Sequence, residues 1–73
     1  MQNQDFPVSS IQRMKTVVVR TDLSRATIYN KLNPASKYHD PDFPAPVRLG
    51  ERSIGFYAHE VQAWIESRRV AGI

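Results

Sequence analysis

Residues 21–32 have the sequence Thr21-Asp22-Leu23-Ser24-Arg25-Ala26-Thr27-Ile28-Tyr29-Asn30-Lys31-Leu32, which predicts the turn and second helix of a helix-turn-helix. Ser24 is a favourable N-cap, because its hydroxyl oxygen can accept a hydrogen bond from a backbone N–H of the first turn. Leu23 and Ile28 have the spacing of a hydrophobic staple, which fixes how the chain enters the helix. Ile28 and Leu32 lie four residues apart and therefore mark its buried face.

The rest of this helix, which we place at 24–33, is rich in side chains that form hydrogen bonds. Arginine is well suited to guanine in the DNA major groove, and asparagine to adenine. We therefore expect this face to contact DNA through Ser24, Arg25, Ala26, Thr27, Tyr29, Asn30 and Lys31. The alternative is that these residues form only the solvated face that any amphipathic helix has.

The composition limits the classes of protein to which the chain can belong. Its 73 residues suffice for one domain, and its net charge of +3 suits a polyanionic partner. The chain has no cysteine, which excludes disulfides and thiolate zinc sites. No apolar run is long enough to span a membrane, and the N-terminal residues lack a signal-peptide pattern, so we expect a cytoplasmic, nucleoid-associated protein.

The segments on either side of the second helix also have clear patterns. A first helix is predicted from Gln12 to Arg20 by apolar residues at helical spacing, namely Met14, Val17 and Val18. Asp22 occupies the tight turn, where Gly is common, and Asp tolerates a positive φ better than most residues. Asn33-Pro34 predicts the end of the second helix, because the residue before a proline is disfavoured in helical dihedrals.

Two alternating runs, 47–49 and 53–57, flank Gly50-Glu51-Arg52 and predict a β-hairpin over 47–57. Four of its residues are expected to face the core: Val47, Leu49, Ile54 and Phe56. Arg48 and Arg52 are expected to project outward and contact DNA phosphates, although they could also be ordinary exposed residues.

A last helix is predicted from His59 to about Arg69, with Val61, Trp64 and Ile65 on one face. We expect Trp64, Phe43 and Phe56 to lie in the core. The predicted fold class is α+β, mostly α: a winged helix-turn-helix with three helices and a two-stranded hairpin wing. The expected organisation is a flexible N-terminal arm at 1–11, the DNA-binding domain at 12–69 and a tail at 70–73.

His39, Asp40 and Asp42 could be imagined as a metal or acid–base cluster. They lie in a proline-rich loop without a third histidine or a cysteine nearby, so we interpret them as solvated turn residues. No nucleophile–base pair is recognisable in the sequence. We therefore expect no enzyme activity, no metal, no cofactor and no small-molecule ligand.

Four segments of the chain, at 23–29, 43–50, 52–56 and 60–65, closely resemble the AlpA family of phage and prophage transcriptional regulators. The resemblance covers residues 12–68. It implies a winged helix like that of the MerR group, related to phage excisionases, and DNA binding near prophage or genomic-island recombination genes. Two positions depart from the family pattern: Asp22 replaces the usual turn Gly, and His59 stands where a Ser N-cap is common.

Three functions remain open at this point. The chain is expected to be a transcriptional regulator, and the first alternative is an excisionase-like directionality factor that binds attachment-site DNA. The second is a protein-interaction adaptor that does not bind DNA and uses Tyr29 and Tyr38. If the partner is double-stranded DNA, so small a domain is expected to bind as a dimer or as adjacent copies.

Overall fold

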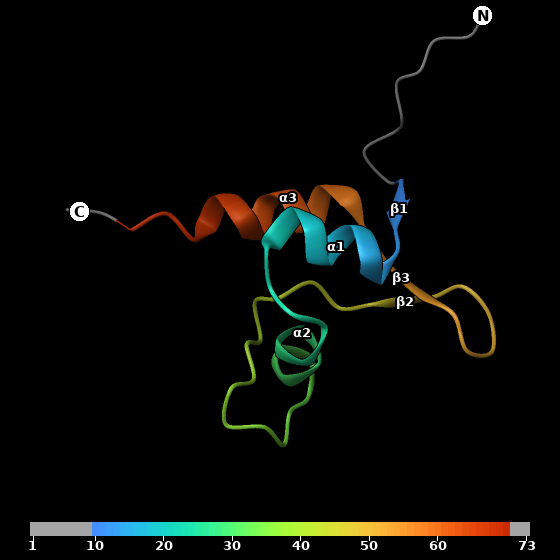
Figure 1. The fold of residues 1–73 in the computed structure, drawn as a ribbon, viewed down its shortest axis with the longest axis horizontal. Helices are drawn as coiled ribbons and strands as arrows, with labels where there is room; N and C mark the ends of the chain where they lie inside the picture. Colours follow the sequence, from blue (N-terminus) through green and yellow to red (C-terminus); the bar gives the residue numbers. More distant parts are fainter. Residues whose placement is uncertain (1–9, 71–73) are drawn as a thin grey trace, which may run out of the picture.

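The computed structural model describes residues 10–70 and confirms the three-helix winged fold (Figure 1). The chain forms in order β1 (Ile11–Gln12), α1 (Met14–Thr21), α2 (Arg25–Leu32), β2 (Val47–Arg48), β3 (Ile54–Tyr57) and α3 (Ala58–Ser67). In Figure 1, α2 is seen end-on below α1, and the β2–β3 hairpin extends from the side opposite to the end of α3. Most of the expected N-terminal arm (1–9) and of the expected tail (71–73) lies outside the described residues.

The helix-turn-helix has the local geometry that its sequence predicts. Asp22 adopts the left-handed conformation, with φ 59° and ψ 24°, and its backbone N–H donates to the carbonyl of Val18 at 2.8 Å. Ser24 is extended, and its Oγ accepts the backbone N–H of Thr27 at 3.1 Å. Asn33 leaves helical dihedrals, with φ −91° and ψ 111°, directly before Pro34. The turn, the N-cap and the end of α2 are therefore confirmed.

The sheet has three antiparallel strands in the order β1-β3-β2. Its first strand, β1, pairs Ile11 with Tyr57 and Gln12 with Phe56. The predictions for these two residues were wrong: Ile11 was assigned to the flexible arm and Gln12 to the start of the first helix, whereas both pair with β3 and α1 begins at Met14. Two residues are too few to show an alternating pattern. The backbone N–H of Ala58 extends this pairing by donating to the carbonyl of Ser10 at 2.8 Å.

The predicted turn at 50–52 is present, but the predicted division of the hairpin into faces is wrong. Val47 pairs with Gly55 and Arg48 pairs with Ile54. Directly opposed residues point to the same face of a sheet, so Val47 lies on the face opposite to Ile54. Phe56 shares the core face and is fully buried, whereas Leu49 shares the outer face with Val47 and is 44% exposed.

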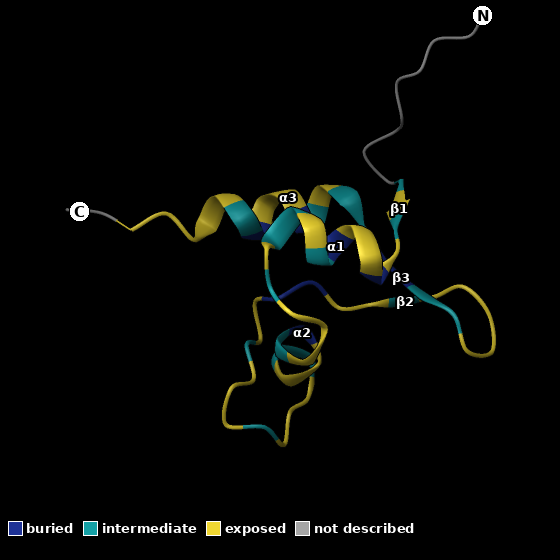
Figure 2. Cartoon of the chain, in the orientation of Figure 1, coloured by how far each residue is buried: buried dark blue, intermediate teal, exposed yellow. Residues whose placement is uncertain are grey.

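The core lies where α1, α2, α3 and the sheet meet, and Figure 2 shows the exposed outer surface of α2 beside it. Phe43 packs between the other two aromatic residues of the core. Its ring centroid lies 6.2 Å from that of Phe56 and 4.9 Å from that of Trp64. These three rings were predicted to be core residues, and all three are buried. The other buried members are Met14, Val17, Ile28 and Val61.

The third helix begins one residue earlier than predicted. Its N-cap is Tyr57, whose side chain makes no capping hydrogen bond. His59 is therefore the second residue of α3 and not its N-cap, which corrects the interpretation drawn from the family pattern. Its ring lies 5.7 Å from the ring of Tyr57, centroid to centroid.

Candidate nucleic-acid interface

One face of α2 is exposed along its length. Arg25, Ala26, Tyr29 and Asn30 are all exposed, and their spacing places them on one side of a helix. Ile28, on the opposite side, is completely buried. Tyr29 is 49% exposed, a large fraction for an aromatic residue in the middle of a helix. The helix is thus held against the core by the buried Ile28 and the partly buried Leu32, and it presents the four exposed residues outward.

Ser24 and Thr27 use their hydroxyl groups within the protein. The Oγ of Ser24 accepts the backbone N–H of Thr27 and donates to its Oγ1 at 2.9 Å. Both side chains therefore stabilise the first turn of α2, which carries Arg25. Their contribution to any interface includes this positioning of the helix start.

Lys31 lies apart from the exposed face. It is half-buried, and its Nζ sits 5.5 Å from the centroid of the Trp64 ring. Its carbonyl accepts the backbone N–H of Asp40 at 3.0 Å and contacts Nδ1 of His39 at 2.8 Å. Lys31 therefore connects α2 to the loop at 33–46 and to α3.

Arg25 and Tyr29 share a hollow of about 270 Å³ with Arg52 from the hairpin turn. Arg13 and Lys15, from the start of α1, line the same hollow. The Nε of Arg13 donates to the carbonyl of Ile54 on β3 at 3.2 Å. Sequence reasoning missed Arg13 and Lys15, because their nearness to α2 and to the hairpin depends on packing between distant segments.

Arg48, the other hairpin arginine, has a different setting. Its side chain is exposed, and one terminal guanidinium nitrogen donates to the carbonyl of Glu51 at 3.0 Å. The guanidinium therefore lies across the hairpin turn and outside the set of residues that line the hollow. Of the two hairpin arginines, Arg52 lines the hollow, whereas Arg48 is bonded to the hairpin turn.

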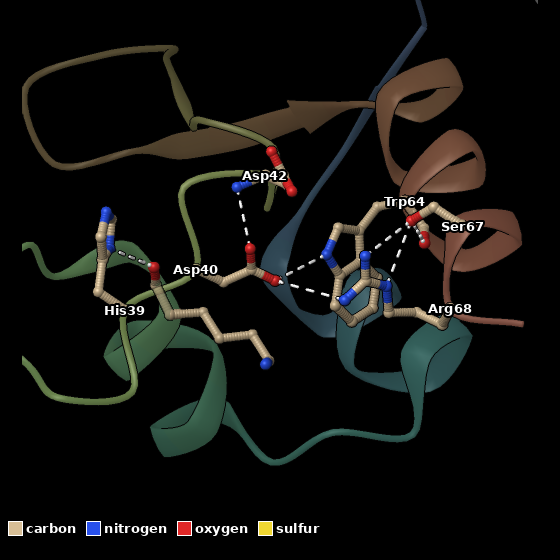
Figure 3. A network of polar contacts seen from close by, with 7 residues as sticks. His39, Asp40, Asp42, Trp64, Ser67 and Arg68 are labelled. Atoms are coloured by element: carbon tan, nitrogen blue, oxygen red, sulfur yellow. Dashed lines mark hydrogen bonds and ion pairs between the residues drawn. The ribbon is translucent and has the colours of Figure 1, made fainter. Parts of the chain in front are cut away.

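Asp40 corrects the interpretation of the 39–42 segment as wholly solvated (Figure 3). Its carboxylate accepts the indole N–H of Trp64 at 3.0 Å and the backbone N–H of Asp42 at 2.9 Å. A guanidinium nitrogen of Arg68 lies 3.9 Å from the same carboxylate. Burial raises the pKa of Asp40, but the two hydrogen bonds and the charges of Arg68 and Lys31 outweigh it and hold the pKa below its ordinary value.

His39 and Asp42 are exposed, as the sequence indicated. Within residues 10–70, no three His, Cys, Asp or Glu side chains are grouped so that they could hold a metal ion. No helix in this described part of the chain is long and apolar enough to cross a membrane. The polar side chains on the exposed face of α2 and around the adjacent hollow are instead arginine, lysine, tyrosine and asparagine.

A comparison with protein families and a comparison with individual proteins both match this chain to AlpA proteins. Residues 10–69 match the family described as "Prophage CP4-57 regulatory protein (AlpA)". The chain is 40% identical over 58 residues to a protein of Escherichia coli (strain K12) named "DNA-binding transcriptional activator AlpA", covering 80% of this chain and 83% of that protein. No solved structure matches the chain. The family match spans most of the chain and includes every helix and strand described above, so this protein belongs to the AlpA family.

Proposed function

We propose that this protein is a DNA-binding regulator of transcription. The exposed face of α2 enters the major groove, while the hairpin at 47–57 lies over the adjacent sugar-phosphate backbone. The observation that carries the proposal is the hollow in which Arg25 and Tyr29 of α2 meet Arg52 of the hairpin. A reading helix and a basic wing on the same side of the molecule are what groove recognition with flanking phosphate contacts requires.

The chemistry of each exposed side chain suits a role in this mode of binding. Arg25 is the first residue of α2, and its guanidinium can donate two hydrogen bonds to the O6 and N7 of a guanine. Asn30 can pair in the same two-bond manner with an adenine. Ala26 permits close approach of the helix, and its methyl group suits contact with a thymine methyl. Tyr29 presents a ring and a hydroxyl that can reach a phosphate.

The biological setting is proposed from the relatives. The name of the Escherichia coli relative describes a DNA-binding transcriptional activator, and the family description is that of a prophage regulatory protein. We therefore propose that this protein regulates genes of a prophage or genomic island, without catalytic activity and in the cytoplasm. It binds as a dimer or as adjacent copies, because one small domain buries little DNA surface.

Selection of bound sequences from a random pool of duplex DNA tests this function. The expected result is one enriched motif, with saturable binding that weakens as salt concentration rises. A variant with both Arg25 and Asn30 replaced by Ala serves as the control, since it should lose the enrichment while it remains folded. If the wild-type protein shows no saturable binding to any duplex at modest salt, DNA binding is excluded and the adaptor alternative gains support.

A further inference from the structure

The hollow beside α2 concentrates positive charge from three parts of the chain. Arg13 and Lys15 come from the start of α1, Arg25 from the start of α2, and Arg52 from the hairpin turn. Met14, Tyr29 and Ile54 complete its lining, so no carboxylate borders it. We call this feature the basic hollow. Four of the ten lysines and arginines of the chain meet there.

The four cations of the basic hollow are not neutralised by the fold. Within residues 10–70, none of them forms an ion pair, and neither α1 nor α2 has an acidic residue in its first turn. Other arginines are used internally: Arg20 donates to the side chains of Gln12 and Gln62, and Arg68 approaches Asp40. Four like charges around one hollow repel one another, and a bound anion would relieve this repulsion.

Arg13 is held in a defined orientation at the edge of the basic hollow. Its Nε donates to the carbonyl of Ile54 on β3, which leaves both terminal guanidinium nitrogens available as donors. This bond also connects the start of α1 to the wing across 41 positions of sequence. A guanidinium that is already oriented loses less side-chain entropy when it binds an anion, and its fork matches the oxygens of a phosphate.

We propose that the basic hollow binds the sugar-phosphate backbone of DNA, with Arg13 and Lys15 as phosphate contacts beyond those on α2 and the wing. The assignment rests on the proposed function, because it requires α2 to lie in the groove that this backbone borders. Arg25, at the boundary between the basic hollow and the exposed face of α2, then reaches toward the bases. The neighbouring phosphates of one strand are contacted by Arg13, Lys15 and Arg52.

The test compares three single substitutions that each remove one positive charge: Lys15→Gln, Arg13→Gln and, as the matched control, Arg69→Gln. Arg69 is exposed and follows α3 by two residues, and that end of α3 lies on the side of the molecule opposite the hairpin (Figure 1). Affinity for a selected and a random-sequence duplex is measured by fluorescence anisotropy over a range of salt concentrations. Far-UV circular dichroism and urea unfolding establish that each variant is folded.

Each of the variants Lys15→Gln and Arg13→Gln is expected to weaken binding to the selected duplex and to the random-sequence duplex by the same factor. Each should reduce the slope of log affinity against log salt by about 0.9, the value for one lost phosphate contact. Arg69→Gln should leave the slope unchanged, and Arg13→Lys should restore most of it. Lys15 has no side-chain hydrogen bond or ion pair within residues 10–70, so Lys15→Gln tests the site even if Arg13→Gln loosens the wing.

Two results would overturn the assignment in distinguishable ways. If the wild-type protein binds DNA but the two variants have the same slope as Arg69→Gln, the basic hollow is not a phosphate site and the proposed function stands. If the wild-type protein binds no duplex saturably, the proposed function fails and this assignment fails with it.

Discussion

The indole Nε1 of Trp64 donates a 3.0 Å hydrogen bond to the carboxylate of Asp40, which joins the middle of α3 to the loop that follows α2. Arg68 closes the same cluster, with its guanidinium 5.0 Å from the centroid of the Trp64 ring and a nitrogen 3.9 Å from Asp40 (Figure 3). Since Asp40 also donates its backbone N–H to the carbonyl of Lys31, the loop is held at both α2 and α3. The cluster therefore fixes where the end of α2 lies.

Asp40→Asn should make the free energy of unfolding less dependent on pH in the acid range. The pKa of Asp40 is below its ordinary value of 3.8, so the unfolded state takes up the proton first. The stability that the carboxylate contributes is fully present above that ordinary value and is lost as pH falls through the lower pKa of the folded state. Urea unfolding at descending pH should show this acid-side loss in the wild type and a smaller loss in the variant.

Asp42→Asn is the control for this experiment, because the Asp42 side chain is exposed and Asp40 uses only its backbone N–H. It should retain the acid-side loss of the wild type. If Asp40→Asn and Asp42→Asn have the same pH dependence, the Asp40 cluster does not stabilise the folded state through its charge.

Trp64→Ala should lower the free energy of unfolding by about 3–5 kcal/mol, because a large aromatic side chain is removed from the core. For a domain of this size such a loss removes most of the stability. Trp64→Phe keeps a ring against Phe43 but cannot donate to Asp40, so its loss should be smaller. Urea unfolding followed by circular dichroism measures both. If Trp64→Ala were as stable as the wild type, the Trp64 side chain would not contribute to the core.

Local rules of sequence were sufficient for α2 and its turn. The N-cap at Ser24 and the stop at Asn33 depend on residues within one helix and its edges, and both are present. Leu23, the predicted staple residue, packs against the core cluster that contains Ile28. The left-handed Asp22 was likewise predictable, since the tight turn requires an unusual φ. Features set by neighbours in sequence can be derived from sequence alone.

Features that depend on distant neighbours could not be derived in the same way. Asp40 lies in a loop that looks solvated until Trp64, 24 residues later, is seen beside it. The basic hollow is assembled from three elements, so no pattern within one segment marks Arg13 as part of it. Interfaces that several elements build have to be found in three dimensions.

The division of the hairpin into two faces is an intermediate case, because it could have been derived from the length of the predicted turn. A three-residue loop at 50–52 makes Leu49 and Ser53 opposite one another, and the N–H of Leu49 does donate to the carbonyl of Ser53 at 2.7 Å. Counting outward from that pair places Val47 with Gly55 and leaves Ile54 on the other face. Register follows from loop length, and alternation of apolar residues alone gave the wrong answer.

Gly55→Ala should destabilise the domain by about 1–3 kcal/mol, the usual cost of overpacking. A Cβ at this position would overlap Cγ2 of Ile11 and approach Cδ1 of Leu49 at 3.1 Å. Unfolding in urea measures the loss. Ile11→Ala removes the overlapping methyl group, so the double variant should be more stable than the sum of the two single losses predicts. Strict additivity would show that β1 does not pack over Gly55.

The most direct test of base reading is Arg25→Lys. The substitution keeps the positive charge at the edge of the basic hollow but removes the fork that can bond to O6 and N7 of one guanine. We therefore expect non-specific affinity to be nearly unchanged. Affinity for the selected site should fall by about 1–3 kcal/mol, with the loss confined to one base pair.

The deciding measurement is the affinity of wild type and Arg25→Lys for every single-base variant of the selected site. Asp22 is the nearest acidic residue in sequence, yet Arg25 forms no ion pair within residues 10–70, so its guanidinium is not held by the fold. If Arg25 reads a base, the mutant profile flattens at one position and matches the wild type elsewhere. A uniform loss at all positions would instead place Arg25 with Arg52 among the phosphate contacts. Base discrimination would then fall to Asn30 and Ala26 farther along the exposed face of α2.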